Sequence, residues 1–235
     1  MNLILLSDAD FITPNRVRLN DRRLKHIQDI LKTERGQSLS VGKINDLMGQ
    51  GTVVSKTNNA IELEVKLNAK PPEALPLLLI LALPRPPMLK RILFSAAMLG
   101  VKKIIILNFN RVEKSLWNSS SLKPQAITEQ LVLGLEQAKD TVMPEVILKK
   151  KFKPFVQDEL PALIKGKLAL VAHPQPCQPP GLTRSTPGVL IIGPEGGIID
   201  YEIELLKAAD CQPVNLGPRI LRTEYVLPYV VGKLF

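Results

Sequence analysis

The sequence predicts an α/β protein in two parts: a small, mostly β part up to about residue 70, then a domain built on a parallel sheet. Ile61–Leu67 alternates strictly between apolar and polar residues, as in a strand with one face on a core and one in water. Lys70-Pro71-Pro72 marks the boundary, because successive prolines end regular structure. Continuous apolar runs then alternate with helical patterns, which predicts strands buried on both faces with helices between them.

Residues 1–70 are predicted to form a small β-barrel with one inserted helix. Met1–Leu6 is apolar but has no basic residues before it and is followed at once by acidic ones, so we expect a short strand and not a signal peptide. Asn20–Lys32 has helical spacing, and Gly36 lies just past its end. The apolar face of this helix would carry Leu24, Ile27, Ile30 and Leu31. Asn58-Asn59 predicts a hairpin turn between strands at Val53-Val54 and Ile61–Leu67.

Residues 71–235 show the strand and helix signals of a parallel α/β domain. Gly100 is expected to cap a helix over Met88–Leu99, and the helix over Pro124–Lys139 has proline in its first turn. A proline-rich surface loop is expected over Pro174–Pro187. The buried strands are predicted at Leu77–Leu83, Lys103–Leu107, Leu168–Ala172 and Val189–Ile192.

The composition favours a globular protein with a basic surplus and indicates which kinds of site it lacks. Of 235 residues, 45% are hydrophobic, which suits a packed core, and the net charge of +9 favours either a polyanionic partner or simply a basic surface. Cys177 and Cys211 have no paired metal spacing, and His26 and His173 are far apart, so neither a zinc site nor a disulfide framework is expected. No apolar run is long enough to span a bilayer, and the cytoplasm is the expected compartment.

The strongest local signal is Leu190–Gly197, a buried strand that runs into the turn Gly-Pro-Glu-Gly-Gly. Glycines allow positive φ angles and let a ligand approach the backbone, and ligands of open α/β sheets bind at the carboxyl ends of strands. Asp200 is expected to cap the following helix, with Glu202 in its first turn. Taken alone, this segment also fits a purely structural turn, and its spacing matches neither a P-loop nor a dinucleotide-binding fingerprint.

A second glycine turn lies in Val214–Glu224, between a short strand and a terminal helix. Arg219, Arg222 and Glu224 cluster there among apolar residues. An arginine in this place suits a phosphate or carboxylate, although for this motif alone an Arg–Glu pair on a helix surface is the favoured interpretation. Pro228 is expected to interrupt the terminal helix, which ends at Phe235.

Together and in this order, the two motifs resemble the bacterial 16S rRNA uridine-N3 methyltransferases, a family of the knotted SPOUT superfamily that uses S-adenosylmethionine. Weaker matches follow the order of the family along nearly the whole chain: His26-Ile27, Ile30–Lys32, Leu99–Val101, Glu136-Gln137 and Pro144–Val146.

The resemblance implies a PUA-like, RNA-binding β-barrel in residues 1–70 and a SPOUT methyltransferase domain with a C-terminal trefoil knot in residues 71–235. It also implies a homodimer that acts on 16S rRNA or the small ribosomal subunit, without a metal or a membrane. The donor would be bound by three loops. The cofactor-binding residues carried over are Leu170, His173, Gly193, Pro194, Glu195, Gly196, Gly197, Leu216, Gly217, Ile220, Leu221 and Arg222.

For catalysis, Arg222 is the candidate for stabilising negative charge that develops on the base. Glu224 or Glu195 would orient the base, accept a proton or cap a backbone amide. The residues predicted to contact RNA are Arg16, Arg18, Arg22, Arg23, Lys25, Lys32, Arg85, Lys90, Arg91 and Arg111.

Three positions depart from the family pattern: the turn Asp140–Val142 where a basic turn is usual, Tyr225 where a small polar residue is usual, and Met98 where glutamate is frequent. Tyr225 would narrow the cofactor pocket or alter the dimer seam. Two alternatives therefore stay open: a SPOUT enzyme with another acceptor, and an RNA-binding assembly factor without catalysis.

Overall fold

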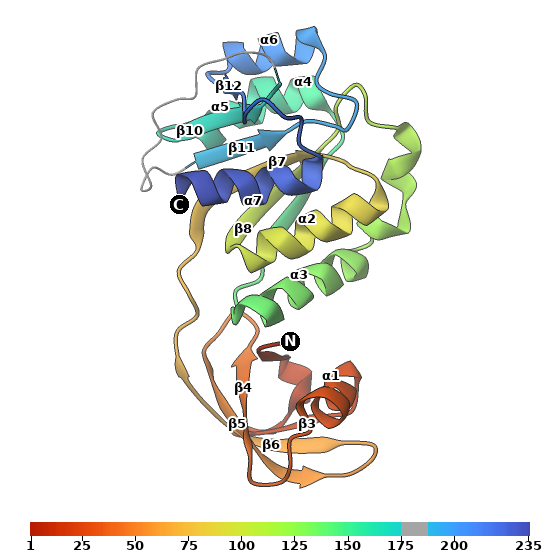
Figure 1. Ribbon diagram of the computed structural model, residues 1–235, viewed down its shortest axis with the longest axis vertical. Helices are drawn as coiled ribbons and strands as arrows, with labels where there is room; N and C mark the ends of the chain where they lie inside the picture. The colour runs from red at the N-terminus through yellow and green to blue at the C-terminus, as the bar shows by residue number, and fades with distance from the viewer. Residues whose placement is uncertain (175–187) are drawn as a thin grey trace. The chain divides into compact units, whose positions relative to one another are not determined.

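The computed structural model describes residues 1–174 and 188–235, so Cys177 and the predicted proline-rich loop, from residue 175, lie outside the described residues. The chain forms two compact units (Figure 1). The first comprises Met1–Glu73 and Val132–Met143, and the second comprises Ala74–Leu131 and Pro144–Phe235. The first unit thus includes a segment that the sequence assigned to the second part. In the described ranges, no helix has both the length and the apolar character to cross a bilayer.

The first unit is a curled, mostly antiparallel sheet of six strands (Figure 1). The β5–β6 connection is the hairpin predicted at Asn58-Asn59, and only β1 and β4 pair in parallel. In spatial order the strands are β1 (Ile4–Leu6), β4 (Ser38–Lys43), β5 (Met48–Lys56), β6 (Ile61–Ala69), β3 (Arg16–Leu19) and β2 (Phe11–Thr13). A 3₁₀ turn, η1 (Asp8–Asp10), links the first two strands in sequence.

The core of this unit follows the alternation seen in the sequence, since Ile61, Leu63 and Val65 of β6 are all buried in it. The predicted helix is shorter than expected. Helix α1 (Arg22–His26) continues into a π-helical turn, η2 (Ile27–Leu31), which ends at Lys32 with a φ of +50°. Leu24 and Ile27 are buried, but the prediction for Ile30 and Leu31 was wrong, since both are exposed. The wider π turn rotates them off the face that α-helical spacing assigns to them.

The second unit contains an all-parallel sheet of six strands, which confirms the predicted α/β class with a parallel sheet. In spatial order the strands are β12 (Gln212–Val214), β10 (Leu168–Ala172), β11 (Gly188–Ile192), β7 (Leu75–Ala82), β8 (Val101–Leu107) and β9 (Glu145–Lys149). The four predicted buried strands correspond to β7, β8, β10 and β11, whereas β9 was not predicted. Apolar residues fill the central strands, as in Leu79–Ala82, which are fully buried.

The helices and helical turns of this part of the chain are α2 (Pro86–Met98), η3 (Lys114–Asn118), η4 (Ser120–Leu122), α3 (Pro124–Ala138), α4 (Phe152–Pro154), the π turn η5 (Phe155–Glu159), α5 (Leu160–Ile164), α6 (Asp200–Ala208) and α7 (Thr223–Leu234). Helices α2 and α7 lie side by side on one face of the sheet, where α2 contacts β8 and α7 contacts β11 (Figure 1). Gly100 follows α2 with a φ of +83°, as its predicted capping role requires. Helix α7 runs through Pro228 without a break, so the predicted interruption was wrong. Proline disfavours a helix interior, but here the burial of Val226, Leu227 and Val230 stabilises the helix on both sides of it.

The strand order places a topological switch between β7 and β11. From β7 the chain adds β8 and β9 towards one edge, and β11, β10 and β12 then occupy the other side. Loops leave the two strands at a switch point in opposite directions, and this opens a crevice at their carboxyl ends. The Gly-Pro-Glu-Gly-Gly turn follows β11 directly and therefore lies at this crevice.

Candidate functional site

A cavity of about 620 Å³ lies at the carboxyl ends of the strands in the second unit. Four chain segments line it: Arg85–Met88 after β7, Ala172–Pro174 after β10, Ile192–Ile198 after β11, and Asn215–Val226, which leads from β12 into α7. Its size lies within the roughly 300–1,000 Å³ typical of sites for small molecules and cofactors. The cavity therefore occupies the place where the fold positions ligands.

The first glycine bend shapes one wall of the cavity. Gly197 has a φ of +81°, a conformation that favours glycine, and its N–H donates to the carbonyl of Pro194 at 2.8 Å. Gly193 is buried, and a Cβ added to it would collide with the side chain of Ile198. This bend thus requires glycine at two positions for different reasons: backbone conformation at Gly197 and close packing at Gly193.

The second glycine bend, Leu216–Arg222, forms the opposite part of the lining. Gly217 has a φ of +129°, and its N–H donates to Oδ1 of Asn215 at 2.8 Å. The side-chain amide of Asn215 also donates to the carbonyl of Pro174 at 2.8 Å. Asn215 therefore connects the ends of β12 and β10. Sequence reasoning missed it, although an asparagine before a glycine turn is a recognisable signal.

Most residues predicted to bind the cofactor do line this cavity. Two of the predicted residues lie elsewhere. Leu170 is buried inside the sheet because it precedes the end of β10 by two residues, and Gly196 faces the side chain of Arg111. Those that line the cavity are His173, Gly193, Pro194, Glu195, Gly197, Leu216, Gly217, Ile220, Leu221 and Arg222.

Arg222 and Glu224 meet at the start of α7. Nε of Arg222 lies 3.4 Å from Oε1 of Glu224, and Nη1 of Arg91, from α2, lies 3.5 Å from the same oxygen. The Glu224 side chain is only 5% exposed, whereas that of Arg222 is 66% exposed. Arg222 also approaches the sulfur of Met88 on the cavity wall, at 3.5 Å from Nη2. A buried carboxylate thus holds an arginine whose guanidinium remains accessible at the cavity.

Among the described residues, the other ionisable groups that line the cavity are Arg85, His173, Glu195 and Arg219. Arg85 lies 3.7 Å from Glu195, in the first bend, and 3.3 Å from Glu113, so it crosses the rim of the cavity as an ion-paired side chain. Burial lowers the pKa of His173, the charge of Lys207 lowers it further, and Asp200 opposes the shift. The His173 ring is therefore largely neutral at physiological pH.

Comparison with known proteins points to the same part of the chain that forms the cavity. Residues 71–233 match the model of the RNA methyltransferase domain family, and this range contains the whole cavity lining. The chain belongs to this family. The resemblance seen in the sequence is thereby confirmed.

The relatives extend over nearly the full chain. The ribosomal RNA small subunit methyltransferase E 1 of Borreliella burgdorferi is 25% identical over 95% of this chain and 93% of its own length. The ribosomal RNA small subunit methyltransferase E of Treponema pallidum is 27% identical over 95% of this chain and 86% of its own length. Among solved structures, the ribosomal RNA small subunit methyltransferase E of Neisseria gonorrhoeae, bound to S-adenosylmethionine, has a TM-score of 0.75 at 18% identity, covering 99% of this chain and 96% of that one.

Within the methyltransferase domain, the predicted RNA-contacting residues Arg85, Lys90, Arg91 and Arg111 are all exposed. Three of them also have protein partners. Arg85 pairs with Glu195 and Glu113, Arg91 pairs with Glu224, and Nη1 of Arg111 donates to the carbonyl of Gly196. Of the four, only Arg85 lines the cavity.

In the first unit, Arg16, Arg18, Lys25 and Lys32 are exposed, although Arg16 lies 3.4 Å from Glu62. Arg22 forms a two-point ion pair with Glu136 at 2.9 and 3.0 Å. The prediction for Arg23 needs correction. Its side chain is 12% exposed. Its guanidinium donates to the carboxylate of Asp10, to the carboxylate of Asp21 and to the backbone carbonyl of Leu5. Arg23 is therefore a structural residue of this unit and is not part of the exposed basic surface.

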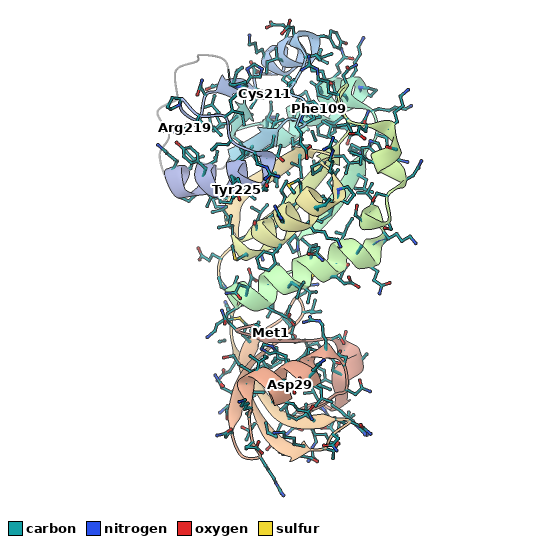
Figure 2. The ribbon with its side chains drawn as sticks, turned by 45° about the vertical axis from the view of Figure 1, so that its right-hand side comes forward. Met1, Asp29, Phe109, Cys211, Arg219 and Tyr225 are labelled. Carbon is teal, nitrogen blue, oxygen red and sulfur yellow. The ribbon has the colours of Figure 1, made fainter. Side chains whose placement is uncertain are left out.

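The departures from the family pattern have identifiable surroundings. Asp140 and Thr141 are buried in the first unit, where Thr141 donates to the carbonyl of Asp46 and accepts from the N–H of Asn45. Two of the three residues of that turn are therefore packed inside the first unit, whereas Val142 is partly exposed. Tyr225 is 56% exposed and does not line the cavity, so it does not narrow it (Figure 2). Met98 is partly exposed at the end of α2.

The remaining features concern the start of α6 and the question of a metal site. Asp200 is the first residue of α6 and not its cap, which is Ile199; the carboxylate of Glu202 instead accepts from the Ile199 N–H at 3.4 Å. Among the described residues, no three His, Cys, Asp or Glu side chains gather in a way that would hold a metal ion.

Proposed function

We propose that this chain is an S-adenosylmethionine-dependent methyltransferase that methylates N3 of a uridine in 16S rRNA of the small ribosomal subunit. The observation that carries the proposal is the cavity between the two glycine bends, which lies wholly within the range that matches the family model. The names of its relatives, which are small-subunit rRNA methyltransferases, support the choice of RNA. The S-adenosylmethionine bound to the similar Neisseria gonorrhoeae structure supports the choice of donor.

The residues at the cavity fit S-adenosylmethionine. Gly197 and Gly217 expose main-chain atoms where larger residues would place a Cβ, and their positive φ angles make such replacements unfavourable. Ile198, Leu221 and Val226 supply an apolar wall suited to an adenine ring. When bound, the donor supplies an electrophilic methyl group on a sulfonium, and the protein's contribution is to position the acceptor nitrogen and to stabilise its charge.

Uridine N3 is a poor nucleophile until it loses its proton, so the site must favour the uridine anion. We assign this task to Arg222, whose accessible guanidinium lies at the cavity and suits the carbonyl oxygens beside N3. Glu224 is buried, and its contact with Arg222 fixes where the guanidinium lies. Glu224 or Glu195 would accept the proton. Glu195 pairs with Arg85 at the rim and is 38% exposed, whereas Glu224 pairs with both Arg222 and Arg91 and is 5% exposed. The contacts of Glu224 therefore suit it to orienting Arg222.

The RNA would be bound by both units. N3 is hidden in a paired base, so the target uridine must be unpaired or flipped out. Residues 1–70, in the first unit, resemble a PUA-like barrel. We propose that this unit contacts phosphates through its exposed cations Arg16, Arg18, Lys25 and Lys32. A net charge of +9 favours such an electrostatic contribution.

The same proposal includes a C-terminal trefoil knot in residues 71–235, a homodimer, and action in the cytoplasm. The dimer is supported by apolar side chains that lie exposed around the cavity, Ile220 and Tyr225 among them, since exposed apolar groups favour a protein partner. A second copy placed there would lie close to the donor cavity.

The test is a methyl-transfer assay with radiolabelled donor on small ribosomal subunits that lack the modification, followed by digestion and nucleoside chromatography. The proposal expects the label in 3-methyluridine. Label in a ribose or in another base would establish the alternative of a different acceptor. Calorimetry that shows no donor binding at millimolar concentration, together with retained RNA binding, would establish the assembly-factor alternative.

A further inference from the structure

The first glycine bend is connected to a loop that takes no part in lining the cavity. This loop, Asn108–Val112, follows β8, and here it is called the β8 loop. Its residue Phe109 is buried (Figure 2), which anchors the loop in the domain. Two hydrogen-bonded links join the β8 loop to the first bend and to the helix that follows it, and the β8 loop is the donor in both.

The first link is made by Arg111. Its Nη1 donates to the carbonyl of Gly196, and the side chain runs along the two adjacent glycines. A Cβ added to Gly196 would lie 3.4 Å from Cδ of Arg111, and one added to Gly197 would lie 3.6 Å from its Nη1. The bend therefore packs against the arginine on one face, while Gly197 belongs to the cavity lining.

The second link is made by Glu202, whose side chain is 2% exposed in the first turn of α6. Its Oε1 accepts from the backbone N–H of Asn110 at 2.7 Å, and its Oε2 accepts from the backbone N–H of Ile199 at 3.4 Å. Burial raises the pKa of Glu202, while these two hydrogen bonds and the charge of Arg111 oppose the increase. A buried carboxylate is costly unless it is hydrogen-bonded, so the fold must keep both N–H donors at Glu202. These contacts therefore fix the β8 loop at Asn110 against the start of α6 at Ile199.

We infer that Arg111 and Glu202 are positioning residues that hold the Gly-Pro-Glu-Gly-Gly bend in the shape required by the methyl donor. The inference rests on the proposed function in taking S-adenosylmethionine as the ligand. It assigns to Arg111 a role within the domain, in place of the RNA contact that its exposure and charge suggest. Because donor contacts here are made by main-chain atoms, a bend that loses its supports would bind the donor less well without losing any residue that touches it.

The variants that test this are Arg111→Ala, Arg111→Lys and Glu202→Gln. Lys114→Ala is the matched control, since it removes an exposed positive charge three residues further along the same segment. Glu202→Gln keeps the size of the buried side chain and an acceptor oxygen, which protects folding, but removes the charge. Three quantities are measured for each variant: amide hydrogen exchange of residues 193–199 in the protein without ligand, the dissociation constant for S-adenosylmethionine by calorimetry, and the affinity for RNA by filter binding.

Arg111→Ala is expected to speed exchange in residues 193–199 about fivefold and to weaken donor binding by a similar factor, from the typical value of one hydrogen bond to a charged group reduced for the solvent exposure of Arg111. Glu202→Gln should have effects of about the same size, because Glu202 is buried but glutamine keeps a neutral acceptor in its place. Arg111→Lys should recover part of both effects, and Lys114→Ala should change neither. In steady-state assays the KM for the donor should rise while kcat at saturating donor stays within about twofold.

Unchanged exchange in Arg111→Ala would overturn the inference, whatever the donor result. So would a variant that loses RNA affinity alone, because that outcome assigns Arg111 to the RNA surface. If exchange rises as expected but the unaltered protein binds no S-adenosylmethionine, the positioning role stands and the proposed function fails.

Discussion

Replacement of Arg222 by alanine tests the chemical step directly. Removing one preorganised donor from a site that stabilises a developing anion costs roughly 10²–10³ in kcat. The Arg222 side chain is 66% exposed, so solvent screens part of its effect, and we expect a loss near the lower limit. A decrease of about 50-fold in the rate of methyl transfer corresponds to about 2.3 kcal/mol of transition-state stabilisation.

The assay is single-turnover transfer from labelled donor to unmodified small subunits, with enzyme in excess. Arg91→Ala is the control, because Arg91 contacts the same oxygen of Glu224 but does not line the cavity. It should slow transfer less than about fivefold, since only the support of Glu224 is weakened. The reasoning would be refuted if Arg222→Ala kept its rate within about threefold, or if the two variants lost rate equally.

Three further predictions concern the first unit and the RNA surface. Arg22→Ala should lower the free energy of unfolding in urea by about 2 kcal/mol, because it leaves the Glu136 side chain, which is 1% exposed, without its ion-pair partner. Arg18→Ala, at an exposed position, should change the free energy of unfolding by under about 0.5 kcal/mol, and equal effects would contradict a stabilising pair at the buried Glu136. Burial alone would raise the pKa of Asp10, but hydrogen bonds from Arg23 and Ser7 outweigh it and lower the pKa below 3.8. Its contribution to stability is therefore present above pH 3.8 and lost as the pH falls through the lowered pKa, so Asp10→Asn should flatten that part of an acid titration followed by circular dichroism. RNA affinity should fall at least about tenfold between about 50 and 200 mM salt, and a flat response in filter binding would remove the case for phosphate contacts.

The features that the sequence predicts correctly are those set by local patterns. The strands β7, β8, β10 and β11 are continuous apolar runs, and the hairpin at Asn58-Asn59 combines a turn signal with alternating residues. Strand β9 was missed because it lies at the sheet edge, where Glu145–Lys149 is only partly buried and gives no clear period. The π turn in η2 was missed because α-helical spacing fits the same letters, and only the backbone geometry separates the two.

The lining of the cavity was largely predictable, non-glycine residues such as His173 and Arg222 included. The two glycine bends were identified because their motifs, in this order, resemble those of a known family, and the cavity lies between them. The roles of individual arginines were not predictable. Arg23 meets Asp10 and Asp21 within its own unit, and Arg111 meets a backbone carbonyl 85 residues further along the chain. A positive charge in a sequence has the same appearance whether its partner is a phosphate, a buried carboxylate or a carbonyl.

The central claim is that the two glycine bends bind the methyl donor through their main chain. The most direct measurement is a titration of S-adenosylmethionine into protein labelled with ¹⁵N-glycine, followed by amide chemical shifts. The account predicts saturable shifts at Gly193, Gly197 and Gly217, while Gly36 and Gly49 of the first unit stay fixed. Shifts confined to other glycines, or none at millimolar donor, would contradict it.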